Sequence, residues 1–122
     1  MKGLAFWFVF LGSLFALAGM AWGIQMSSSN NYALASAHAH SNLVGFVAMA
    51  LYGIFYALAP AHADGKLAKI HFVLAAIGAL LMGPGIAMAI MRQGEVVAIL
   101  ASIATILGML CFAVNVWRSR TA

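Results

Sequence analysis

Residues 70–91 read IHFVLAAIGALLMGPGIAMAIM and contain no Asp, Glu, Lys or Arg. A hydrocarbon core of about 30 Å is crossed by about 20 apolar residues in a helix, so this run is long enough to span a membrane. Three other runs have the same character, at residues 3–24, 38–59 and 96–117. The runs are continuous rather than alternating, which favours helices over barrel strands. The sequence therefore predicts an all-α integral membrane protein, a four-helix bundle formed by one domain over residues 1–122.

The composition is typical of a membrane protein and of no soluble class. Hydrophobic residues make up 66% of the chain and charged residues 7%, whereas a soluble domain is about 45–50% apolar and about 25% charged. The net charge is +4, but the six Lys and Arg residues lie at the ends of the apolar runs and form no basic face. The composition therefore excludes a soluble enzyme, a disordered segment and a nucleic-acid binder, and it predicts membrane lipid as the surrounding partner.

The polar connections predict where the spans end and how they are oriented. Residues 25–37 are uncharged, with Ser36 as the expected N-cap of the second helix, and Pro60 is expected to end that helix. With both termini in the cytoplasm, Arg92 is the only basic residue on the outer side, where Glu95 offsets it. The excess of positive charge on the other side predicts a multi-pass protein of a bacterial inner (cytoplasmic) membrane with both termini cytoplasmic. The residues of that excess are Lys2, Lys66, Lys69, Arg118 and Arg120.

Histidines are the side chains near the four runs that titrate close to neutral pH, and ionisable groups at membrane depth are functional candidates by default. His38 and His40 open the second run. Residues two apart on a helix point about 200° away from each other, so the two imidazoles cannot hold one metal ion on one helix face. Each histidine therefore needs its own neighbourhood, which another copy of the chain can supply.

The residues around this pair favour haem over a bare metal ion. Zinc or copper requires carboxylates or several converging histidines, whereas haem needs only one or two axial ligands, most often histidine. The alternative is that both histidines are wetted at the membrane surface and bind nothing, and the residues alone leave both interpretations open.

Other ligand candidates are weaker. His71 begins the third run on the opposite side of the membrane, so it cannot share a haem with the pair and is at most a second cofactor site. His62 is expected to be a solvated loop residue. Met88 and Met91 are minor candidates, because methionine also ligates haem iron but more often fills gaps in apolar packing.

The sequence HAHSNLVGF at residues 38–46, with FY at 55–56 and IHF at 70–72, carries a family resemblance. It resembles the short four-helix proteins related to subunit I of the haem–copper oxidases, often labelled cytochrome c oxidase subunit I-like. The large oxidase subunit has twelve helices in three arcs of four, and the second helix of one arc carries a His-x-His pair that serves two haems. Three copies of this chain would also supply twelve helices.

The resemblance implies a homotrimer with haem b at the subunit interfaces. Each haem would take His38 from one copy and His40 from a neighbour as axial ligands. Asn42, one turn below His38, belongs to the expected cofactor site. Arg92 corresponds to loop arginines that contact the haem propionates, which we favour over a simple pair with Glu95 because charge-assisted bonds to a carboxylate are strong.

The chain also departs from the oxidases. The outer end of the third run lacks the histidines that hold copper, so no haem–copper catalytic centre and no oxidase activity are expected. A bis-histidine haem has no open coordination position, which favours a b-type cytochrome that carries single electrons between an unidentified donor and acceptor. The alternatives are a haem-based redox or gas sensor and a copper- or nickel-binding membrane protein.

Overall fold

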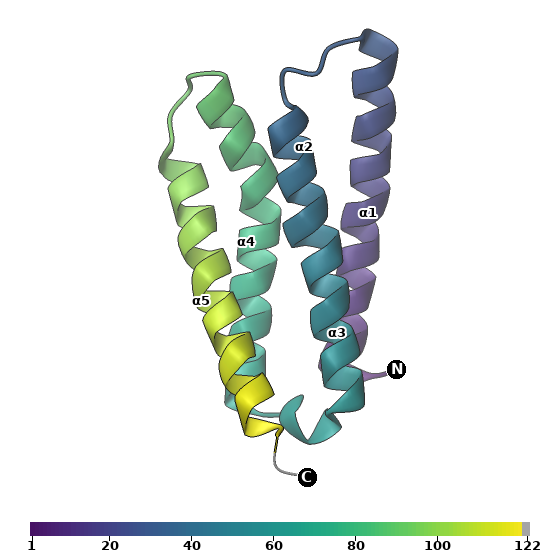
Figure 1. Cartoon of the computed structure of the whole chain (residues 1–122), viewed down its shortest axis with the longest axis vertical. Coiled ribbons are helices and arrows are strands. Elements are labelled where there is room, and N and C mark those ends of the chain that lie inside the picture. Colours follow the sequence, from purple (N-terminus) through teal and green to yellow (C-terminus); the bar gives the residue numbers. More distant parts are fainter. Residues whose placement is uncertain (121–122) are drawn as a thin grey trace.

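The computed structural model describes residues 1–120, which form four long helical rods side by side (Figure 1). The first rod is α1 (Gly3–Ser29), and the second is made of α2 (Ala35–Asn42), a π-helical segment η1 (Leu43–Val47) and α3 (Ala48–Leu58). After a 3₁₀ turn η2 (Pro60–His62) come α4 (Lys66–Ile90) and α5 (Val96–Arg118). All four rods are long and apolar enough to cross a membrane, which confirms the predicted all-α architecture with four spans.

Both termini lie at one end of the bundle (Figure 1), which we call the terminal end, and the opposite end is the distal end. α1 packs along α3, α4 packs along α5, and α2 joins the two pairs by contacting α4. His38 and His40 therefore lie toward the distal end, and His71 in the second turn of α4 lies toward the terminal end. This separation agrees with the prediction that His71 cannot share a cofactor with the pair.

The helices run past the apolar segments from which they were predicted. α1 continues to Ser29 and ends at Asn30, which has a left-handed backbone (φ 53°) and whose N–H bonds to the carbonyls of Met26 and Ser27. The predicted N-cap at Ser36 is wrong, because α2 begins at Ala35 after Leu34 and has no side-chain cap. Hydropathy marks the part of a helix that meets lipid, whereas polar residues can continue the backbone hydrogen bonding beyond it.

The π-helical segment η1 interrupts the second span three residues after His40. Its five residues, Leu43–Val47, have no proline or charge that would have predicted it. A π turn inserts an extra residue and rotates the helix faces on its two sides, and such turns are frequent at functional sites. Although α2 and α3 belong to one span, they can therefore turn different faces toward their neighbouring helices.

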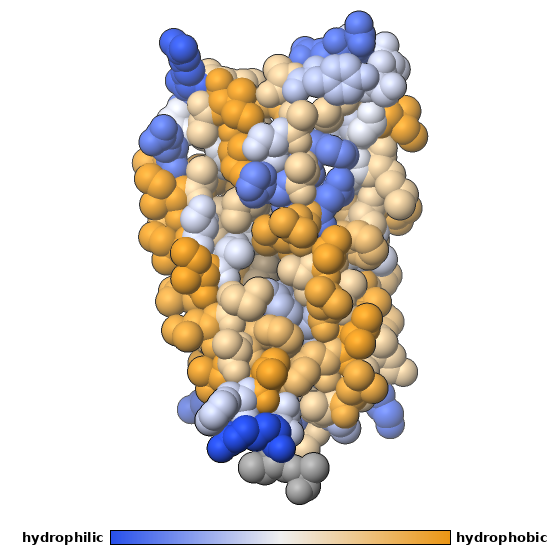
Figure 2. All heavy atoms as spheres, in the orientation of Figure 1, coloured by the Kyte–Doolittle hydropathy of each residue, from blue (hydrophilic) through white to orange (hydrophobic). Residues whose placement is uncertain are grey.

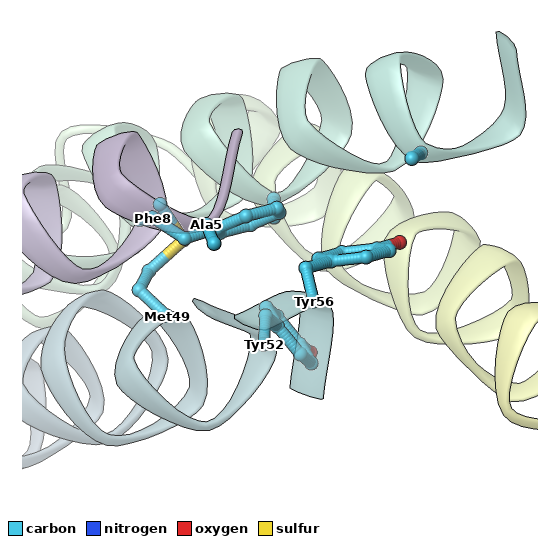
Figure 3. Packing of buried hydrophobic residues seen from close by; sticks show 8 residues of the cluster. Ala5, Phe8, Met49, Tyr52 and Tyr56 are labelled. Atoms are coloured by element: carbon cyan, nitrogen blue, oxygen red, sulfur yellow. The ribbon is translucent and has the colours of Figure 1, made fainter. Parts of the chain in front are cut away.

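The core occupies the terminal half of the bundle and is built from aromatic and small residues (Figure 3). Phe8 of α1 packs against Tyr52 and Tyr56 of α3, with ring centroids 5.6 Å apart in both pairs. Elsewhere small residues let backbones meet, as in membrane helix packing generally. A Cβ added to Gly85 of α4 would lie 2.7 Å from the backbone nitrogen of Ala98 in α5.

The outside of the bundle is apolar along its length and polar at its ends (Figure 2). Large apolar side chains such as Leu58, Ile24 and Ile106 are at least 67% exposed, which suits a surface that faces lipid. Polar atoms also extend from the distal end onto the visible face near α2 (Figure 2). In that view the stretch near α2 is therefore less apolar than the surface further from the distal end.

Candidate functional site

His40 stands on the exposed side of α2, in the second turn of the helix. Its Nδ1 lies 2.8 Å from the backbone oxygen of Ser36. A carbonyl oxygen only accepts, so Nδ1–H donates in this bond and the lone pair of the imidazole is on Nε2. Metal-binding histidines have this arrangement, because a carbonyl bonded to one ring nitrogen fixes the tautomer and the ring orientation for the other.

His38 faces the other way, into the contact between α1 and α2. Its ring meets Trp22 edge to face, with centroids 5.7 Å apart, and its Cε1 would lie 3.4 Å from a Cβ placed on Gly23. Asn42 Nδ2 donates to His38 Nε2 over 3.3 Å. His38 Nδ1 is buried and has no hydrogen-bond partner within residues 1–120. The ring is therefore held inside its own chain.

Where α1 contacts Asn42 and His38, its surface is formed by a GxxxG motif. A Cβ added to Gly19 would overlap the side-chain amide of Asn42, and Gly23 lies one turn further, against His38. Glycine at position 19 is therefore needed for Asn42 to reach its present position. Close packing of α1 and α2 through these glycines is what holds the Asn42–His38 pair.

One expectation about the pair can now be compared with its geometry. The prediction that the histidines face different neighbourhoods is confirmed, because His40 is exposed while His38 lies between two helices of one chain. Of the two rings, His40 lies on the outside of the chain, whereas the half-buried His38 lies against Trp22 of α1. The difference arises because Asn42, four residues after His38, captures its ring within the same helix.

Three other candidate residues, Arg92, Met91 and Met88, lie toward the distal end. Arg92 is exposed in the turn after α4, with a left-handed backbone (φ 58°). Met91 lines a pocket of about 310 Å³ together with Trp22, the ring that meets His38, whereas the half-buried Met88 does not line it. Within residues 1–120, no three His, Cys, Asp or Glu side chains converge on a point that could hold a metal ion.

The imidazole nitrogens of His40 and His38 fit the requirements of haem in part. His40 offers one oriented imidazole nitrogen on an exposed helix face, which is what an axial ligand at an interface requires. His38 can bind iron through Nε2 only after its hydrogen bond to Asn42 is broken. One copy of the chain therefore presents one ready ligand, and a second has to come from a rearranged His38.

A second polar centre lies at the terminal end, where three helices meet. It consists of Tyr56 of α3, His71 of α4 and Asn115 of α5, which we call the terminal cluster. Tyr56 is 1% exposed, His71 is fully buried and Asn115 is 2% exposed. The Tyr56 hydroxyl lies 2.8 Å from His71 Nδ1 and accepts a bond of 2.9 Å from Asn115 Nδ2. His71 Nε2 is buried with no hydrogen-bond partner within the described residues.

Sequence reasoning singled out His71 and missed its partners. Tyr56 and Asn115 are 59 positions apart, so no local pattern connects them. The available signal was Asn115 itself, an amide inside an apolar run, because polar side chains at membrane depth need partners on other helices. His62, in contrast, is outside the four spans, as predicted.

Comparison of the chain with protein-family models, with curated proteins and with solved structures gives no match.

Proposed function

We propose that this protein is a b-type cytochrome of a bacterial inner membrane that carries single electrons, with its termini in the cytoplasm. The proposed assembly is a homotrimer in which haem b lies at the subunit interfaces near the distal, periplasmic end. The observation that supports it is the exposed His40 ring, whose Nδ1 is bonded to the Ser36 carbonyl and whose Nε2 is left with a lone pair. An exposed, oriented imidazole at the edge of a lipid-facing surface needs a ligand or a partner.

His40 of one copy and His38 of a neighbour are the proposed axial ligands. Because Asn42 donates to His38 Nε2, that ring has to leave Asn42 before it can bind iron. Arg92, exposed in the turn at the same end, is proposed to bond a propionate. When bound, haem iron supplies a reversible one-electron couple whose potential depends on axial ligands, hydrogen bonds and burial.

The first experiment is a dithionite-reduced minus air-oxidised absorption spectrum of the purified protein, with the haem-to-chain ratio. We expect a sharp b-type α band, its loss in His40→Ala, and no change in His62→Ala, the matched control outside the spans. Haem that binds His40→Ala normally would refute the ligand assignment. No haem after expression with adequate haem supply would refute the cytochrome proposal and direct metal analysis toward copper or nickel.

The assembly is tested separately by native mass spectrometry in detergent. We expect three chains with haem, and dissociation of haem on dilution into monomers, because each site would take ligands from two copies. A monomer that keeps full haem would refute the shared site.

Labelling of single cysteines placed at Gly94 and at Gly65, in a Cys111→Ala background, tests the orientation of the chain in the membrane. Only the cysteine at position 94 should react from the periplasm.

A five-coordinate haem sensor is the second candidate, and the Asn42–His38 hydrogen bond favours it. If His38 stays bonded to Asn42, iron bound to His40 keeps an open position for a gas molecule. A carbon monoxide difference spectrum separates the two proposals. An unaltered α band supports the six-coordinate electron carrier, and a shifted band supports the sensor.

A further inference from the structure

The fully buried His71 ring is surrounded by aromatic rings. Its centroid lies 4.4 Å from that of Tyr52, 5.1 Å from Phe8, 5.6 Å from Phe112 and 5.7 Å from Tyr56. Cations within about 6 Å of aromatic centroids are attracted by the ring quadrupoles, more strongly when water is excluded. The four rings, which we call the aromatic cage, come from three helices and enclose the imidazole.

The hydrogen bonds of the terminal cluster have a defined direction. Asn115 Nδ2 donates to the Tyr56 oxygen, so the Tyr56 O–H is left to donate to His71 Nδ1. His71 is then neutral, with its single proton on Nε2. An asparagine amide carries a donor and an acceptor, so turning the amide would let the same chain run in reverse, from His71 through Tyr56 to Asn115 Oδ1.

We propose that His71 is a proton-binding site, in which the aromatic cage and a reversed hydrogen-bond chain hold the imidazolium. The imidazole of His71 takes one proton from a hydronium ion, which becomes a water molecule. In the protonated state Nδ1–H donates to Tyr56, and the Tyr56 O–H donates to Asn115 Oδ1. This site is independent of haem, and its ligand is a proton delivered from the terminal end.

Two pockets at the terminal end adjoin the cluster. Asn115 lines a pocket of about 300 Å³ together with His62, Lys66 and Arg118. Tyr56 lines a second hollow of about 560 Å³ at the start of α1. Asn115 and Tyr56 therefore each border a hollow at the terminal end, whereas His71 is fully buried.

The charged and titratable groups around the site lie at the start of α1, before α4 and on α5. Lys2 at the start of α1 and Asp64 before α4 line the wider hollow. Cys111 lies one turn before Asn115 in α5. Asp64 is the only acidic side chain at this end, and it lies outside the spans. Binding therefore relies on the aromatic cage and on Asn115 rather than on an ion pair.

The experiment is a pH titration of ¹⁵N-histidine-labelled protein in lipid nanodiscs, with His71 assigned by the loss of its signals in His71→Gln. Between about pH 4 and pH 8, the His71 nitrogens should change from the neutral to the protonated pattern. Asn115→Leu removes the acceptor for the reversed chain and should lower the midpoint by about one pH unit or more, a tenfold loss in proton affinity. Tyr32→Phe, at an exposed tyrosine outside the cluster, is the matched control and should leave the midpoint unchanged.

A purely structural role for the cluster gives a different result. His71 would then keep its neutral pattern in the wild type over the whole range, which would overturn the proposal without any variant. An unchanged midpoint in a folded Asn115→Leu protein would overturn the reversed chain. If Asn115→Leu does not fold, Phe112→Leu replaces it, since the loss of one ring of the cage should also lower the midpoint.

Discussion

The distal histidine pair and the terminal cluster are both polar centres in an apolar bundle, but their hydrogen bonds differ in range. Each bond of the pair links residues four positions apart in the second span, His40 to Ser36 and His38 to Asn42. The bonds of the terminal cluster join three helices. Local bonds orient a side chain without holding helices together, so the pair can be rearranged by a ligand while the cluster cannot move without the bundle.

The two centres also differ in burial. His40 is exposed and His38 is half-buried. In the terminal cluster, Tyr56 is 1% exposed, His71 is 0% exposed and Asn115 is 2% exposed. An unmade hydrogen bond costs most where no water can replace the partner. Substitutions in the cluster should therefore reduce stability more than substitutions in the pair, and three variants test this difference.

The largest effect is expected from Tyr56→Phe. It removes one hydroxyl and leaves both His71 Nδ1 and Asn115 Nδ2 buried without a partner, which should cost about 2–4 kcal/mol in the free energy of unfolding. Reversible unfolding in mixed micelles measures it. Tyr32→Phe, at a residue 55% exposed, is the matched control and should change little. A loss below about 0.5 kcal/mol in Tyr56→Phe would mean that water satisfies the cluster.

The sequence predicts the four spans well, because their length and hydropathy are set by the membrane and are properties of continuous segments. It does not predict the helix ends at Ser29 and Ala35, where polar residues continue the backbone hydrogen bonds. It also does not predict η1, since a π turn depends on how the second span packs on α1 and α4. The position of a span is thus encoded in a local segment of sequence, whereas irregularities within the span depend on tertiary packing.

The candidate sites divide in the same way. The opposite directions of His38 and His40 follow from helix geometry alone, and the structure confirms them. The hydrogen bond from Asn42 to His38 requires a particular rotamer of Asn42. That rotamer depends on the space left by Gly19, and therefore on α1. The partnership of Tyr56 with Asn115 depends on the packing of α3 against α5, which no spacing in the sequence specifies.

A smaller effect is expected from Gly19→Ala, which tests how far α1 shapes the distal pair. The added methyl group would overlap the Asn42 amide, so Asn42 has to rotate away from His38, at about 1–2 kcal/mol. Gly23→Ala is the matched control one turn along the same helix, where the new Cβ meets His38 Cε1 at an ordinary 3.4 Å. Equal losses in both variants, measured by unfolding, would contradict a specific contact at Gly19.

The smallest effect is expected from Asn42→Ala, which removes a single part-buried bond of 3.3 Å. We expect a loss of about 0.5 kcal/mol, because the site is near the distal surface where water can replace the amide. The emission of Trp22, whose ring meets His38, should change as His38 gains freedom, whereas Ser102→Ala, at a hydroxyl bonded only within its own helix, should leave it unaltered. If Asn42→Ala were as destabilising as Tyr56→Phe, the distal pair would be holding helices together in the same way as the terminal cluster. His38 would then be too firmly bound to leave Asn42 for an iron, and a haem with His40 as its single histidine would be the better interpretation.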